Sequence, residues 1–227
     1  MLLLVTDTSG KHGSVGLVRA DEKSTAIEVI EEVPLSGGTF SAQLVPQIAA
    51  LLEKHGFTKA AIGAFIVVSG PGSFTGLRVG LAAIKALAEI LGKPIVPVSL
   101  LEAVALNHGQ AGSILAALDA GRGEVYAGEY EVNSESSHMR RELLLSKDEF
   151  LSLASKTPVA SPDTAIADLL RAAGHFGSLV DRPNAATIAR SGWMKLQAKQ
   201  TVTPEQLEAN YIRRSDAEIF AKPISNA

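Results

Sequence analysis

A short pattern occurs once in each half of the chain and limits the folds that the chain can adopt. In the first half the apolar run "LLLVTD" ends at Asp7, the turn residues "TSGKHG" follow, and "SVGLV" begins a second apolar run. In the second half "SILAALD" ends at Asp119, a glycine turn follows, and another run begins at Val125. An apolar run bounded by turn residues is typical of a buried strand, so each unit predicts a hairpin. The repetition predicts two related lobes.

Strand-like and helix-like segments alternate around these hairpins, which indicates an α/β architecture. The run "AFIVV" predicts a strand, and a helix is expected from Thr75 to Leu91, ended by a glycine and a proline. Ser146 and Glu149 form a capping box for a helix that begins "KDEFL". We expect one lobe over residues 1–108 and a second over 109–227, whose C-terminal segment packs back on the first.

Composition narrows the classes of function. The 227 residues include 21 lysines and arginines against 24 aspartates and glutamates, a net charge of −3, so no basic excess is available for binding RNA alone. The absence of cysteine excludes disulfides, thiol nucleophiles and cysteine metal sites. The apolar start stops at Asp7 without a basic leader, and no apolar run reaches the roughly 18 residues of a membrane span. We expect a cytoplasmic protein that does not enter a membrane.

The stretch "SGPGSFTGLRVG" (69–80) is rich in glycine and leads into the expected helix. It lacks the spacing of a Walker phosphate loop and of a nucleophile elbow, so neither Lys85 nor Ser73 is assigned such a role. Glycine N–H groups before a helix N-terminus can hold an anion. The simpler interpretation is a tight turn in which Ser73 or Thr75 caps the helix.

The helix from Thr75 to Leu91 has little polar surface. Its three charged residues fall within a sector roughly 40° wide, and the rest of its circumference is apolar or small. Gly76, Gly80 and Ala83 form a stripe of small residues, and two glycines in a helix cost together about 2 kcal/mol relative to alanine. The close approach of another backbone would offset that cost. The residues alone do not decide whether it comes from the same chain or from a second subunit.

The passage "VSGPGSFTGLRVGLAAIKALAEILGKPIVPVSLLEA" resembles the TsaB (YeaZ) family, as do "DTS" near the start, "LDAGRGEVYAGEY" and the carboxy-terminal "YIRRSDAE". The resemblance covers nearly the whole chain in the family's order and spacing. It implies an actin-like ATPase (sugar-kinase superfamily) fold, in which two duplicated hairpins grip the phosphates of ATP between lobes. It also implies a non-catalytic subunit that supports TsaD, a paralogue that transfers the threonylcarbamoyl group to the adenosine beside the anticodon of tRNA.

The resemblance carries expectations about sites and partners. Together with the small-residue stripe, it places a partner interface on Gly72, Ser73, Phe74, Thr75, Gly76, Arg78, Val79, Gly80 and Ala83. A vestigial nucleotide or anion site is expected at Asp7, Ser9, Asp119 and Gly121. The expected partners are a second copy of the chain, TsaD, and the ATPase TsaE through the TsaD complex, with tRNA contacted only indirectly. No catalytic residue, metal or cofactor is expected.

Three departures from related proteins support these expectations. TsaD-like proteins carry a metal-binding H-x-x-x-H where this chain has Leu100 and Val104. The adenosine-binding turn of the superfamily needs glycines, whereas here "PVA" runs into "SPDT", so Pro162 and neighbouring side chains would occupy the nucleotide's space. Phe40 stands where many relatives have a histidine. The five histidines, which never pair at metal-ligand spacing, are His12, His55, His108, His138 and His175.

Two other classes of function were weighed. A small-molecule ATP-dependent kinase of the same fold would bind nucleotide between Asp7 and Asp119, but the adenosine turn is unsuitable. A metallopeptidase would need the histidine pair that is missing. The sequence therefore favours an interaction subunit of a tRNA-modifying complex.

Overall fold

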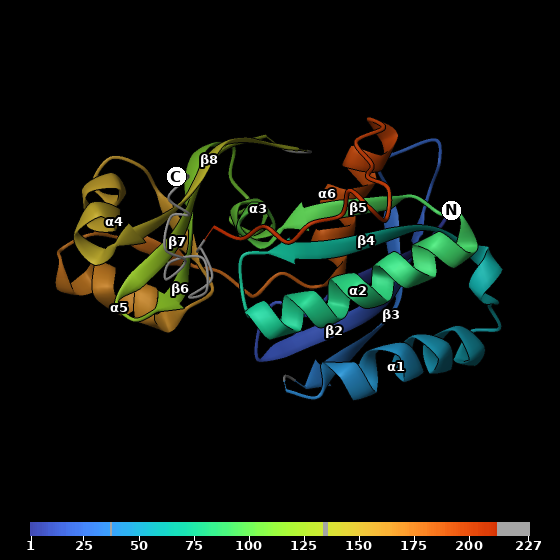
Figure 1. Cartoon of the computed structure of the whole chain (residues 1–227). Helices are drawn as coiled ribbons and strands as arrows, with labels where there is room; N and C mark the ends of the chain where they lie inside the picture. The colour runs from blue at the N-terminus through green and yellow to red at the C-terminus, as the bar shows by residue number, and fades with distance from the viewer. Residues whose placement is uncertain (37, 134–135, 213–227) are drawn as a thin grey trace, which may run out of the picture.

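The computed structural model describes residues 1–36, 38–133 and 136–212. Most of the carboxy-terminal motif "YIRRSDAE" and the end of the expected second lobe lie outside these residues. The described chain forms two five-stranded sheets with helices on their faces (Figure 1). No helix within the described ranges is long and apolar enough to cross a membrane.

The two sheets have the same topology. The first has the strand order β3-β2-β1-β4-β5 and the second β10-β9-β6-β7-β8, which is the same arrangement read from the other edge. In each sheet the first strand in the chain pairs antiparallel with the second and parallel with the fourth. The first sheet contains β1 (Leu2–Asp7), β2 (His12–Ala20), β3 (Ile27–Ser36), β4 (Ile62–Gly70) and β5 (Ile95–Ser99). The second contains β6 (Gly112–Gly121), β7 (Glu124–Val132), β8 (Ser137–Ser146), β9 (Val159–Ser161) and β10 (Gly177–Leu179). The predicted duplication and α/β class are confirmed.

Each sheet is covered on both faces, which explains the apolar character of its central strands. In β1, Leu2 and Leu4 face one layer of helices while Leu3 and Val5 face the other, as the twofold period of a strand requires. The helices are α1 (Phe40–Lys54), α2 (Phe74–Leu91), α3 (Leu100–Asn107), α4 (Lys147–Ala154), α5 (Thr164–Ala172) and α6 (Ala185–Gln197), with a short 3-10 turn, η1 (Lys59–Ala61). Helices α1 and α2 pack beside each other on one face of the first sheet (Figure 1).

The other face of the first sheet meets the second sheet through α3. Apolar residues of both sheets and of α3 and α6 belong to one continuous core, so the lobes share buried surface. Helix α6 follows the second sheet in the chain but packs on the first, where the side chain of Ile66 lies against Gly192. The proposed lobe boundary at residues 108 and 109 falls between α3 and β6. Helix α6 therefore packs with the first lobe, although it belongs to the second half of the chain.

The capping residues predicted at the ends of two helices form the expected contacts. The Ser73 hydroxyl accepts a hydrogen bond from the Gly76 N–H, and α2 ends at Gly92, whose φ of 60° is left-handed. The capping box of Ser146 and Glu149 is formed at the start of α4. The predictions for these two helices are confirmed, with α2 beginning one residue earlier than expected.

Candidate functional site

A cleft of about 1540 Å³ lies between the two lobes. It is lined by the β1–β2 turn, the start of α2, the β6–β7 turn, the start of α5, and residues 210–212. The turns of the two aspartate hairpins predicted from the sequence thus lie at one cleft. What the cleft can bind depends on which polar groups remain available.

In the first hairpin the groups around Asp7 are engaged within the chain. The Asp7 side chain is 3% exposed, and its Oδ1 accepts hydrogen bonds from the Ser9 N–H (2.8 Å) and the Ser9 hydroxyl (2.5 Å). The guanidinium of Arg182 reaches the same place, with Nη2 3.2 Å from Ser9 Oγ and 3.5 Å from Asp7 Oδ2. Arg182 was not among the predicted site residues, because nothing in the sequence relates it to a residue 175 positions earlier.

In the second hairpin two backbone donors are also engaged. The Asp119 N–H donates to Asp163 Oδ2 (2.8 Å), and the Gly121 N–H donates to Asp119 Oδ1 (2.9 Å). Asp163 and Pro162 follow β9 and line the cleft, where the sequence predicted side chains in place of an adenosine turn. Carboxylates of the same chain therefore engage both N–H groups, and near them their negative charge opposes an anion.

The start of α2 packs tightly on the first hairpin. The Ser73 N–H donates to the Ser9 carbonyl oxygen (2.6 Å). A Cβ atom at Gly76 would lie 2.2 Å from the Thr8 carbonyl oxygen, and one at Gly80 would lie 2.1 Å from Thr8 Oγ1. Both glycines are thus required by a contact within the chain. The close neighbour that the sequence left unassigned therefore comes from the same chain and not from a second subunit. Residues 76 and 80 are buried in the isolated chain and present no surface to a partner.

The exposed face of α2 contains other members of the predicted interface. Phe74, Thr75 and Arg78 are exposed, Val79 and Ala83 are half-buried, and Ala82, Ala86 and Ile90 extend the exposed face. The Arg78 guanidinium stacks on the Phe74 ring at 3.7 Å from its centroid, and Arg78 Nε donates to the Tyr211 hydroxyl (3.1 Å). The Phe74 and Tyr211 rings are 5.2 Å apart. We call Phe74, Arg78 and Tyr211 the aromatic–arginine cluster; Tyr211 was not among the predicted interface residues.

The positions that correspond to the metal-binding histidines of TsaD-like proteins are apolar and buried. Leu100 and Val104 are no more than 2% exposed on α3. Within the described ranges no three histidine or carboxylate residues lie close enough to hold a metal ion. Phe40 is buried under Gly13 and Gly76 and so packs in the core.

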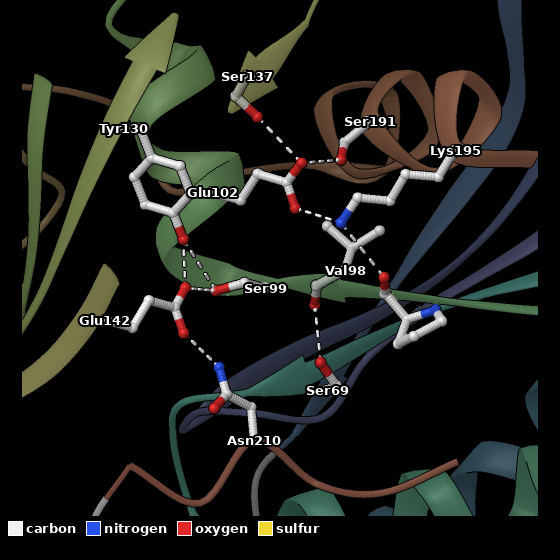
Figure 2. Close-up of polar contacts among 11 residues, drawn as sticks. Ser69, Val98, Ser99, Glu102, Tyr130, Ser137, Glu142, Ser191, Lys195 and Asn210 are labelled. Carbon is white, nitrogen blue, oxygen red and sulfur yellow. Dashed lines mark hydrogen bonds and ion pairs between the residues drawn. The ribbon is translucent and has the colours of Figure 1, made fainter. Parts of the chain in front are cut away.

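A second group of polar side chains joins α3, α6 and strands of both sheets (Figure 2). The Glu102 carboxylate on α3 accepts hydrogen bonds from Ser137 and Ser191 (3.0 Å each) and pairs with Lys195 (2.5 Å). The Glu142 carboxylate on β8 accepts from Ser99, Tyr130 and Asn210. Burial and the neighbouring Glu142 charge raise the pKa of the Tyr130 hydroxyl above its ordinary value. We call these eight residues the interlobe cluster.

The duplicated sheets, the two aspartate hairpins and the cleft between lobes define a protein of the actin-like ATPase class. The family model that describes TsaD, tRNA N6-adenosine threonylcarbamoyltransferase, matches residues 35–158. The chain belongs to this family and, within it, to the TsaB (YeaZ) proteins.

Individual relatives agree with this assignment. The chain is 28% identical to the tRNA threonylcarbamoyladenosine biosynthesis protein TsaB of Haemophilus influenzae over 94% of both chains. It is 32% identical to the protein of the same name from Bacillus subtilis, over 58% of this chain and 56% of that one, so this match spans little more than half of the relative. The solved structure of YeaZ from Pseudomonas aeruginosa shares the fold, with a TM-score of 0.73 at 24% identity, over 92% of this chain and all of that one.

Proposed function

We propose that the protein is a non-catalytic subunit in tRNA threonylcarbamoyladenosine formation and that it acts by binding and supporting TsaD. The biosynthetic role is supported by similarity to TsaB over 94% of both chains. The absence of a catalytic role is supported by the cleft, where the Asp7 carboxylate and the Asp119 and Gly121 N–H groups are engaged by side chains of the same protein. This second observation separates the proposal from that of a kinase.

A kinase of this fold would hold the phosphates of ATP between Asp7 and Asp119. Asp7 is instead covered by Ser9 and Arg182, and the Asp119 N–H is bonded to Asp163. A phosphate would have to displace these contacts and lie beside the carboxylates of Asp119 and Asp163, which costs free energy. We therefore expect the isolated protein to bind and hydrolyse ATP weakly or not at all.

The partner surface proposed here is the exposed side of α1 and α2. The large apolar side chains of Val45, Phe74 and Ile90 are 50%, 40% and 74% exposed in the isolated chain. Exposed alanines between them allow another helix to approach closely, and the aromatic–arginine cluster supplies residue types that often dominate binding energy. Two copies of the chain would pair through this surface, and TsaD, a paralogue, would replace one copy.

Further partners would be reached through TsaD. A net charge of −3 gives little general attraction for tRNA, so we expect contact with tRNA only within the complex. TsaE would likewise join through the TsaD complex, and work on tRNA would place the protein in the cytoplasm.

Omission from a reconstituted reaction tests the proposal. TsaD, TsaE, the enzyme that supplies threonylcarbamoyl adenylate, and substrate tRNA are combined with and without this protein. We expect threonylcarbamoyladenosine formation to fall at least tenfold without it. Undiminished modification in its absence would falsify the proposal, and tight ATP binding by the protein alone would favour the kinase.

A further inference from the structure

Arg182 connects a late part of the chain to the first hairpin. It lies between β10, which ends at Leu179, and α6, which begins at Ala185, yet its Nη2 lies within 3.5 Å of Asp7 and Ser9. Its side chain is 35% exposed, whereas that of Asp7 is 3% exposed. Burying a carboxylate costs free energy unless a positive charge or several hydrogen-bond donors accompany it. Arg182 supplies the positive charge.

The hairpin is shaped to receive this guanidinium. A Cβ atom at Gly10 would lie 2.7 Å from Arg182 Nη2, closer than carbon and nitrogen can approach without displacement. Glycine at position 10 thus lets the guanidinium lie directly on the turn. Ser9, Gly10 and Arg182 all line the cleft between the lobes. The arginine consequently covers the part of the cleft wall that this turn forms.

The hairpin in turn supports the start of α2. The Ser9 carbonyl oxygen accepts from the Ser73 N–H, and Thr8 packs against Gly76 and Gly80 at distances that leave no room for a Cβ atom. A shift of the Asp7–Ser9 backbone would therefore displace the first turns of α2. Those turns contain Phe74 and Arg78 of the aromatic–arginine cluster.

We propose that Arg182 is an internal counter-ion that replaces a bound ligand at the first hairpin and positions α2 through it. The hairpin then holds one conformation without nucleotide or metal, and the partner surface of α2 is formed in advance. Arg182 is a positioning residue, since it acts through Asp7 and Ser9. The claim that α2 forms a partner surface rests on the proposed function. The claim that Arg182 orders the hairpin stands independently of it.

Hydrogen exchange measured by mass spectrometry on the full chain tests the proposal. Arg182→Met removes the charge and keeps much of the apolar stem, while Gly10→Ala displaces the guanidinium and keeps its charge. Arg190→Met, at an exposed arginine on α6, is the matched control. In both test variants we expect exchange about tenfold faster in peptides covering residues 7–13 and 72–80, with peptides from α4 and α5 unchanged. The control should behave as the wild type.

Two further measurements distinguish a counter-ion role of Arg182 from a general structural role and from a ligand-binding role. Adding Asp7→Asn to Arg182→Met removes the uncompensated charge, so it should restore most of the protection of residues 72–80. Unchanged exchange in both test variants, or uniformly faster exchange across the whole chain, would overturn the proposal. Sodium tripolyphosphate and MgATP should leave the melting temperature of the wild type unchanged. Stabilisation by either one that disappears in Arg182→Met would instead make Arg182 a ligand-binding residue and overturn its role as counter-ion.

These outcomes are independent of the partner. Should TsaD not bind this protein at all, the exchange of residues 72–80 would still respond to Arg182→Met as described. Should the exchange not respond while Ala82→Glu abolishes binding to TsaD, the proposed function would stand and the role of Arg182 would be rejected.

Discussion

Lys195 Nζ lies 2.5 Å from a carboxylate oxygen of Glu102, although the two residues are 93 positions apart in the chain. Lys195 belongs to α6, on the first sheet, and Glu102 to α3, between the sheets (Figure 2). Glu102 also accepts from Ser137 on β8 of the second sheet. Through Glu102, Lys195 on α6 and Ser137 on β8 are thus held to the same carboxylate, so the interlobe cluster connects the two sheets.

Replacing Lys195 with methionine should destabilise the protein by about 2–4 kcal/mol, because the change leaves the largely buried Glu102 carboxyl group without its charged partner. The midpoint of urea unfolding measures the loss. The double variant Glu102→Gln/Lys195→Met should recover at least half of it, since a neutral amide costs less to bury. Lys156→Met, at an exposed lysine, should change stability by less than about 0.5 kcal/mol. A loss no larger than that of Lys156→Met would show that the pair contributes nothing.

Tyr130 should make the protein less stable in alkali. Its pKa in the folded protein is raised, first by burial and second by the Glu142 charge, so the folded form keeps the phenolic proton after the unfolded chain loses it near pH 10. Stability is thus retained below pH 10 and falls above it by up to about 1.4 kcal/mol per pH unit from this residue. Urea unfolding between pH 9 and 11 should show a shallower fall in Tyr130→Phe. Equal slopes for both proteins would contradict this assignment.

Gly80→Ala should destabilise the isolated chain, because the new Cβ would meet Thr8 Oγ1 at 2.1 Å. We expect a net loss of about 1–2 kcal/mol after the gain in helix propensity is subtracted. Thr8→Ala in the same chain should relieve the contact and return most of the stability. If Gly80→Ala weakened only the association between subunits and left unfolding unchanged, residue 80 would lie on a partner surface after all.

Ala82→Glu should prevent association without unfolding the protein. Ala82 is exposed at the middle of the proposed partner surface, where the larger side chain would hold the two helices apart and its carboxylate would lose contact with water on pairing. Sedimentation should show at least a hundredfold weaker self-association and TsaD binding. Ala172→Glu, at an exposed alanine of α5 in the second lobe, should leave both unchanged. Equal effects from the two substitutions would contradict the placement of the interface.

The sequence predicted those parts of the fold in which a local pattern determines the structure. Two aspartate hairpins, the ends of α2 and the capping box at Ser146 each depend on residues that are close in the chain. The strands β3 and β8 were not predicted. Both lie at sheet edges, and charged residues interrupt the apolar residues of each strand, so neither forms an apolar run. The family resemblance supplied the duplicated topology that local patterns only suggested.

The polar contacts that organise the cleft were beyond the reach of sequence patterns. Arg182 meets Asp7 only because the chain returns to the first lobe after β10, and Asn210 meets Glu142 only because the segment after α6 runs back beside β4. Gly80 shows a subtler difficulty. The sequence indicated that its missing side chain served a close contact, but only the structure identifies Thr8 as the neighbour.

The rate of threonylcarbamoyladenosine formation, measured while this protein is titrated into a reaction with TsaD, TsaE and adenylate supplier, tests the central claim most directly. Wild type, Ala82→Glu and Asp119→Asn are compared, because they separate the partner surface from the cleft carboxylate. The account predicts that the rate rises to the same plateau with wild type and Asp119→Asn, and that Ala82→Glu leaves it near the rate without this protein. A full rate with Ala82→Glu, together with a background rate from an Asp119→Asn variant that still binds TsaD, would contradict it.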